Sequence, residues 1–115
     1  MTNQDCIFCK IASREIPAPL LAENDLAVAF NDISPRQPVH ILVVPRRHHK
    51  DVAELTEQDP EALLAVMRLG VELAAKYADG SFRFSFNTGA AAGQSVFHAH
   101  GHVTSTQPRN SAAVG

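Results

Sequence analysis

The chain has 115 residues, a net charge of -2 and 45% hydrophobic residues, which predicts one globular domain with an ordinary core. The slightly acidic charge argues against binding to a nucleic-acid polymer, although backbone N–H groups can hold the phosphates of a small nucleotide. No apolar run approaches the roughly 20 residues of a membrane helix, and the first residues lack a signal-peptide pattern. We therefore expect a cytoplasmic protein that does not bind membranes.

The N-terminal half predicts one short helix followed by strands. Apolar residues at helical spacing indicate a helix within residues 5–14, which ends before Pro17 and Pro19. A brief strand is expected at residues 20–22, and alternating apolar residues predict another at 26–30. A β-branched, apolar run at 39–44 predicts a central strand that ends at Pro45.

The C-terminal half predicts a long helix between further strands. A polar stretch over residues 46–54 precedes the helix, for which Thr56 or Asp59 is the candidate N-cap. Its apolar stripe runs to about residue 78 and includes Gly70, which either permits close packing against a sheet or second subunit or is a neutral surface glycine. Strands are expected at 82–86 and 97–104, separated by a Gly- and Ala-rich loop.

These elements predict an α+β domain with an antiparallel sheet and helices on one side. We expect the domain to cover residues 5–106. The remaining residues, 107–115, are small and polar and are expected to form a flexible tail.

Three of the six histidines alternate along the last predicted strand. Because residues two apart point the same way, His98, His100 and His102 are expected to share one face. The opposite, core-packing face would consist of the apolar or small residues Phe97, Ala99, Gly101 and Val103.

Three interpretations of this histidine face are open. It is a solvated face, a zinc site, or a set of imidazoles with separate tasks around one phosphate. A single zinc on all three is disfavoured because the outer two lie ~13 Å apart, against zinc–nitrogen bonds of about 2 Å, although two neighbours could share an ion. We favour the phosphate, since a neutral imidazole can attack phosphorus while its neighbour donates a hydrogen bond. The preceding loop, residues 89–95, offers backbone N–H groups of the kind that cradle anions.

The segment from Gly93 to Val103 resembles the signature of the histidine triad (HIT) family, which is His-x-His-x-His with apolar residues between. Four earlier segments are similar to the Hint branch of this family: Cys6–Ile11, Glu15–Pro17, Asp32–Pro35 and His40–Pro45. The match as a whole runs from about residue 5 to residue 104. The resemblance implies an antiparallel five-stranded sheet with two helices, extended across a homodimer. It also implies a purine nucleotide of the AMP type as substrate.

The resemblance implies a catalytic role for four histidines. His100 would be the nucleophile and form a nucleotidyl-histidine that water hydrolyses, without a catalytic cofactor. His102 would contact the α-phosphate, and His98 and His40 would orient and polarise the groups around the nucleophile. A covalent intermediate of this kind divides one difficult displacement at phosphorus into two.

The resemblance also implies a set of nucleotide-binding residues. Gln94 and Ser95, after Gly93, would bind phosphate, Asn87 would contact phosphate or ribose, and Asp32 would hold the ribose hydroxyls. The apolar slot for the base would be formed by Ile7, Phe8, Ile11, Ile16 and Ile33.

Cys6 and Cys9, spaced as C-x-x-C, suggest half a metal site or a redox pair rather than a structural disulfide. Some members of the family hold a structural zinc, and the resemblance implies Cys6, Cys9, His48 and His98 as its ligands. A Cys2His2 set is a suitable zinc shell. His49 competes with His48 as a ligand, and two reduced thiols without metal are the alternative.

The chain departs from the family pattern in two places. Gly101 stands where a bulky apolar residue is usual and is expected to loosen the packing behind the nucleophile. The segment after Val103 lacks the Gly-Gly and Trp of the Hint tail, which leaves the leaving group open. These departures keep open the alternative of a nucleotide-binding or scaffolding protein with weak catalysis. A zinc-dependent hydrolase that uses the histidines as metal ligands is a further alternative.

Overall fold

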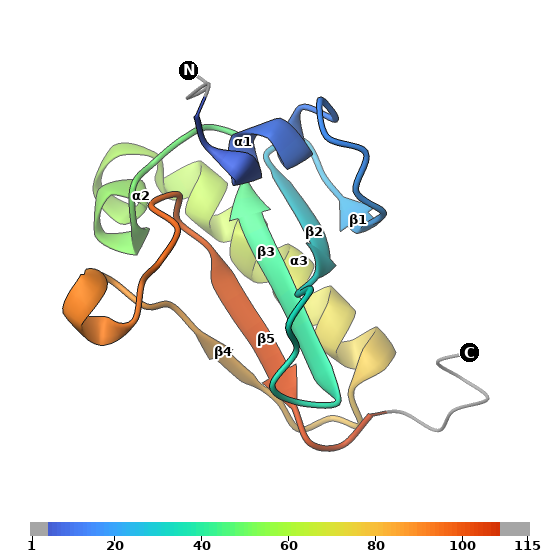
Figure 1. Cartoon of the computed structure of the whole chain (residues 1–115). Helices are drawn as coiled ribbons and strands as arrows, with labels where there is room; N and C mark the ends of the chain where they lie inside the picture. The colour runs from blue at the N-terminus through green and yellow to red at the C-terminus, as the bar shows by residue number, and fades with distance from the viewer. Residues whose placement is uncertain (1–4, 109–115) are drawn as a thin grey trace.

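A computed structural model describes residues 5–108 of the chain. Its centre is a five-stranded antiparallel sheet in the order β1-β2-β3-β5-β4 (Figure 1). The strands are β1 (Leu20–Glu23), β2 (Ala27–Asn31), β3 (Val39–Pro45), β4 (Arg83–Ser85) and β5 (Gly101–Ser105). The predicted α+β class and five-stranded antiparallel sheet are confirmed.

Within residues 5–108, three α-helices accompany the sheet, one more than predicted: α1 (Ile7–Ala12), α2 (Val52–Gln58) and α3 (Pro60–Tyr77). Asp59, one of the two candidate N-caps, caps α3 by accepting a hydrogen bond from the backbone N–H of Ala62, and Pro60 lies in the first turn. The additional helix α2 lies partly in the stretch predicted to be irregular. Its N-cap is Asp51, and Leu55 is its one buried residue, so its sequence carries little helical periodicity.

The helices lie on both faces of the sheet, which corrects the expectation that they share one side (Figure 1). Ala27 and Ala29 of β2 pack with α3, whereas Val28 and Phe30 pack with α1. Alternate residues of the same strand therefore enter two different cores, and β3 is buried along its whole length. The small alanines allow α3 to approach closely, and the larger residues fill the space beneath α1.

The last strand begins later than the sequence pattern predicts. β5 starts at Gly101, so His102 lies on the strand, paired with Leu42 of β3, while His98 and His100 lie in the segment before it. Ala99 and Val103 are buried as expected. Phe97 is 51% exposed, so its assignment to the core was wrong. Without a strand at this position, the alternation of faces does not extend to residue 97.

The ring of Phe84 fills the space left by two glycines. A Cβ atom built on Gly70 of α3 would lie 2.2 Å from Cε2 of Phe84, and one built on Gly101 would lie 2.2 Å from Cε1. Phe86 stacks on Phe84 with ring centroids 5.4 Å apart. The packing behind the segment that carries the alternating histidines is therefore filled from β4, and the expectation that Gly101 loosens it was wrong.

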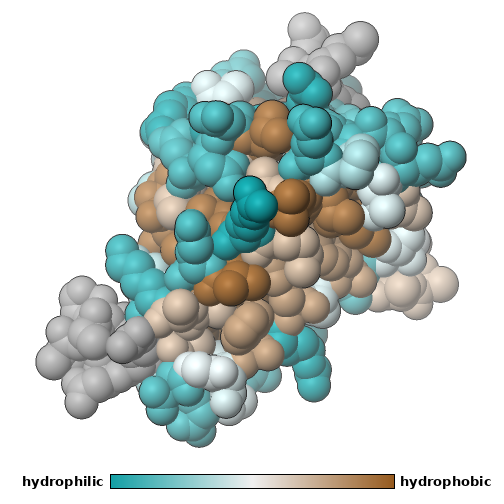
Figure 2. Space-filling model, turned by 180° about the vertical axis from the view of Figure 1, so that it is seen from behind, coloured by the Kyte–Doolittle hydropathy of each residue, from teal (hydrophilic) through white to brown (hydrophobic). Residues whose placement is uncertain are grey.

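Apolar side chains also gather on the outer face that carries α3 (Figure 2). Leu64 and Val71 of α3 and Phe82 before β4 are 49%, 50% and 42% exposed, respectively. No helix among residues 5–108 is long and apolar enough to span a membrane. Gln107 and Pro108, the first residues of the expected tail, pair with Asp79 and Ala78, and the rest of that tail lies outside the described residues.

Candidate active site and metal cluster

A cleft of about 490 Å³ opens between α1, the end of β2 and the segment that carries His98, His100 and His102, called the histidine segment below. Most of its lining is apolar, and its polar groups come from Asp32, Ser95, His100 and His102, together with Asn31. Ile7 and Ile33 lie at its walls and are 49% and 98% exposed. Exposed large apolar side chains beside convergent polar groups are typical of a ligand site.

Eight of the residues assigned to catalysis or nucleotide binding line this cleft: Ile7, Phe8, Ile11, Asp32, Ile33, Ser95, His100 and His102. The remaining assigned residues lie outside its lining: Ile16, His40, Asn87, Gly93, Gln94 and His98. The sequence pattern missed six lining residues, namely Ala18, Pro19, Phe30, Asn31, Leu42 and Val96. Phe30 and Leu42 stood on predicted strands, but their face could not be assigned without knowing where α1 packs.

Gln94 is buried, and its side chain holds the loop that precedes the histidines. Its Oε1 accepts a hydrogen bond from the backbone N–H of Gly89 at 2.9 Å. Its Nε2 donates to the carbonyls of Lys50 and Val96, at 2.6 and 3.1 Å. Asn87 likewise donates to the carbonyl of Ala92 in the 3₁₀ turn η1 (Ala90–Ala92). In this structure the side-chain amides of Asn87 and Gln94 therefore form hydrogen bonds that hold the loop over residues 89–95.

His100 is held with one nitrogen toward the protein. Its Nδ1 lies 2.8 Å from the carbonyl oxygen of His98, and a carbonyl can only accept, so Nδ1 carries the proton. The lone pair of the neutral ring is therefore on Nε2. Burial lowers the pKa of His100, while the bond to His98 and the charge of Asp32 oppose that decrease. The ring also meets the edge of Phe8, with centroids 5.0 Å apart.

His40 and His102 form a pair whose proton positions follow from a backbone group. The N–H of Arg36 donates to Nδ1 of His40 at 3.1 Å, so the proton of neutral His40 is on Nε2. This Nε2 lies 3.0 Å from Nδ1 of His102, which must then accept, leaving Nε2 of His102 as a donor. Burial, together with the charges of the neighbouring His100 and His40, lowers the pKa of His102 to about 4. Asp32 is 3.2 Å from Nε2 of His40.

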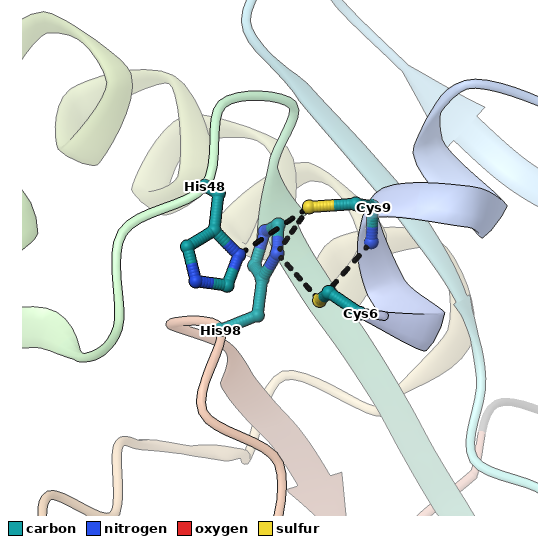
Figure 3. Close-up of side chains that lie close together, drawn as sticks. All are labelled: Cys6, Cys9, His48 and His98. Atoms are coloured by element: carbon teal, nitrogen blue, oxygen red, sulfur yellow. Dashed lines mark hydrogen bonds between the residues drawn. The ribbon is translucent and has the colours of Figure 1, made fainter. Parts of the chain in front are cut away.

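A second cluster joins α1 to the histidine segment (Figure 3). Nδ1 of His98 lies 3.3 Å from the Sγ atoms of both Cys6 and Cys9, and Nδ1 of His48 lies 3.3 Å from Sγ of Cys9. In a tetrahedral zinc site, neighbouring ligand atoms are about 3.3 to 3.8 Å apart. The four donor atoms lie within 4.8 Å of one another and could hold a metal ion.

The orientation of His98 fits this cluster. Its Nε2 donates to the carbonyl of Pro45 at 2.8 Å, so the lone pair on Nδ1 faces the two sulfur atoms. The ring is fully buried, and burial lowers its pKa to about 4, against the bond to Pro45, which raises it. His49 instead lies near acidic groups, with Nε2 3.3 Å from Asp59. The structure thus brings together the expected ligands and separates the competing histidine from them.

Asp32, His40 and His102 are also close enough to share an ion. The backbone N–H of Arg36, however, donates to Nδ1 of His40, so this nitrogen must keep its lone pair. The proton of neutral His40 is then on Nε2, which is the nitrogen that would have to bind the metal. This group is therefore arranged for hydrogen bonding, in contrast to the cysteine cluster.

Comparison with known proteins agrees with the geometry. A family model described as "Scavenger mRNA decapping enzyme C-term binding" matches residues 5–113. Protein HitA of Neisseria gonorrhoeae is 42% identical over 105 residues, which cover 89% of this chain and 96% of that protein. A purine nucleoside phosphoramidase of Escherichia coli K12 is 34% identical over 107 residues, which cover 91% and 90%.

A solved structure has the same fold. A HIT family hydrolase from Clostridium thermocellum superposes with a TM-score of 0.83 and is 36% identical, with 90% of this chain and 91% of that chain covered. The histidine pattern, the fold and these relatives lead to one assignment: the chain belongs to the histidine triad family.

Proposed function

We propose that this protein is a nucleotide hydrolase or transferase that cleaves a P–N or P–O bond at the α-phosphate of a purine nucleotide. The observation that carries the proposal is the fixed tautomer of His100, a cleft residue whose neutral ring has its lone pair on Nε2. A purine nucleoside phosphoramidase is among the relatives, which favours purine nucleotides of the AMP type and P–N cleavage.

The proposed reaction has two displacements at phosphorus. The Nε2 lone pair of His100 forms a bond to the α-phosphorus as the bond to the leaving amine breaks, and the amine takes up a proton from solvent. The imidazole keeps its Nδ1 proton, bonded to the carbonyl of His98. Water then attacks the same phosphorus and gives up a proton to solvent, the N–P bond breaks, and AMP and the neutral imidazole are released. Nε2–H of His102 would donate to a phosphoryl oxygen whose charge grows in each displacement.

The cleft supplies separate regions for the base and the phosphate. Ile7, Phe8 and Ile11 from α1 and Ile33 at the mouth offer apolar surface for a purine. Asp32 is proposed to accept hydrogen bonds from the ribose. Its Oδ1 is already bonded to the backbone N–H of Ser34, which fixes the carboxylate for that purpose.

The experiment that tests the enzyme assignment uses His100→Ala. With adenosine phosphoramidate as substrate, we expect the wild type to release AMP and the variant to release none while still binding AMP. Denaturation of the wild type at alkaline pH during turnover should trap a nucleotidyl adduct on His100, because the P–N bond to an imidazole survives base but is hydrolysed in acid. Retained turnover in the variant, or AMP binding by a wild type that releases no AMP from the phosphoramidate, would contradict the proposal.

For the Cys6, Cys9, His48 and His98 cluster we propose structural zinc, because two thiolates and two imidazoles suit this ion. These residues would hold the metal, which would supply a crosslink between α1 and the histidine segment.

The scaffolding alternative depends partly on loose packing at Gly101, and the ring of Phe84 removes that basis.

A homodimer is proposed as the assembly. β4 is an edge strand of the sheet, the exposed Phe82 directly precedes it, and the exposed Val71 follows Gly70, which packs against Phe84 of β4. A second copy pairing along β4 would extend the sheet and cover part of this apolar surface. Sedimentation of the wild type and of Val71→Asp should give a dimer and a weakened dimer, respectively.

A further inference from the structure

We propose that metal binding at the cysteine cluster and nucleotide binding in the cleft are energetically coupled, because α1 and His98 belong to both sites. This inference rests on the proposed function and goes beyond a purely structural metal. It implies that the metal-loaded protein binds nucleotide more tightly than the metal-free protein, and that nucleotide in turn tightens metal binding.

The first connection is the helix α1 itself. Cys6, its N-cap, and Cys9 supply the two sulfur atoms of the cluster, while Ile7, Phe8 and Ile11 of the same helix line the cleft. A helix of six residues is not stable alone, so its position depends on its contacts with the rest of the protein. Fixing Cys6 and Cys9 to His48 and His98 therefore fixes the wall of the cleft.

The second connection runs through His98 to the nucleophile. The His98 ring belongs to the cluster, and its backbone carbonyl accepts the proton on Nδ1 of His100 at 2.8 Å. Phe8 meets both rings edge-on, with centroids 6.0 Å from His98 and 5.0 Å from His100. A shift of the His98 ring would thus displace two groups that hold His100.

Without metal, the attachment of α1 depends on the thiol–imidazole contacts and on the packing of Phe8, Cys9, Ile11 and Ala12 against the sheet. Ile7, which is 49% exposed, contributes little to that packing and would move with the helix. Nucleotide binding would then have to order α1, and this cost appears as a lower affinity. Coupling between two protein sites is commonly about 5- to 150-fold, and we expect at least about fivefold.

The test measures AMP affinity by calorimetry in the full-length protein, with Zn²⁺ bound and after its removal with a chelator. We expect AMP to bind at least about fivefold more weakly without Zn²⁺. In the reciprocal measurement, saturating AMP should tighten Zn²⁺ binding by the same factor, as determined by competition with a chelator. Equal AMP affinity in both forms, or a protein that binds no Zn²⁺, would overturn the coupling.

Two variants keep the test decisive if removal of Zn²⁺ unfolds the protein, which circular dichroism would reveal. His48→Ala removes the least buried ligand, and at limiting Zn²⁺ it should weaken AMP binding. His49→Ala is the matched control, because His49 contacts Asp59 and lies outside the cluster, so Zn²⁺ and AMP binding should be unchanged. Equal AMP affinity of His48→Ala and wild type at limiting Zn²⁺ would contradict the inference. Failure of the Zn²⁺-loaded wild type to bind AMP would instead contradict the proposed function.

Discussion

Nε2 of His40 and Nδ1 of His102 lie 3.0 Å apart and share the single proton that neutral His40 carries on this side. If His102 became protonated, both facing nitrogens would carry hydrogen and the pair would separate. The contact between His40 and His102 therefore requires a neutral His102, and the dependence of activity on pH tests this requirement.

We expect kcat/KM for adenosine phosphoramidate to fall only below the ordinary histidine pKa of about 6.5 and to be lost as the pH approaches 4. The reason is that burial lowers the pKa of both His100 and His102, that of His102 to about 4, and the proposed reaction needs both rings neutral. The measurement is a pH profile corrected for spontaneous hydrolysis at each pH. An acid limb centred on the ordinary histidine value near 6.5 would be inconsistent with this role.

The same pKa predicts how stability depends on pH. The pKa of His102 is lower in the folded than in the unfolded protein, so the unfolded chain binds more protons between the two values. This contribution to stability is complete above about pH 6.5 and is lost as the pH falls toward 4. Urea unfolding at several pH values should show less of this loss for His102→Asn than for the wild type.

Substitution of Asp32 separates ribose binding from an effect on His40. Asp32→Asn should weaken AMP binding about tenfold or more, because hydrogen bonds to a charged group contribute about 1.5 to 3 kcal/mol each. The control ligand is 2′,3′-dideoxy-AMP, which has no ribose hydroxyls, and its affinity should change little. An equal loss for both ligands would assign the effect to the His40 contact at 3.2 Å.

Gln94 should affect stability as well as activity. Gln94→Ala removes the side chain that bonds to Gly89, Lys50 and Val96, and the loss of such buried bonds costs about 1 to 3 kcal/mol. We expect a lower free energy of unfolding in urea together with a higher KM. If Gln94 served phosphate alone, KM would rise while the unfolding free energy stayed the same.

Gly70→Ala should destabilise the protein, although alanine normally favours a helix by about 1 kcal/mol over glycine. The added Cβ would meet the ring of Phe84, and Gly101 lies close to the other edge of that ring, which leaves the ring little room to move away. Such overpacking costs about 1 to 3 kcal/mol. The same change in a Phe84→Leu background should cost less, and unfolding of all four proteins gives the coupling between the two sites. Additive effects would exclude the clash.

Patterns in the sequence predicted the elements whose burial repeats regularly. The alternation around Val28 and the apolar run of β3 gave correct strands, and the helix carrying Gly70 was recognised from its stripe. The helix α2 has no periodic apolar pattern that would predict it, because Leu55 is its one buried residue, and its start depends on capping by Asp51. Periodicity cannot reveal an element that has little buried surface.

The candidate site was predictable by residue type but not by direction. The alternating histidines suggested one shared face, yet His98 turns to the cysteines while His100 and His102 line the cleft. The different directions of His98 and of the other two histidines depend on where β5 begins and on the hydrogen bond from the backbone N–H of Ala99 to the carbonyl of His49. Both are long-range features that residue spacing does not contain. The lining residues Leu42 and Val96 could not be identified for the same reason.

The ring of Phe84 also constrains how this sequence could change over time. It occupies the volume that a larger residue at position 101 would fill, and it touches α3 and β5 at once. A lineage that acquired a bulky residue at position 101 would first have to reduce the side chain at position 84. The reverse order would pass through a poorly folding intermediate, so substitutions at positions 84 and 101 are expected to occur in a fixed order.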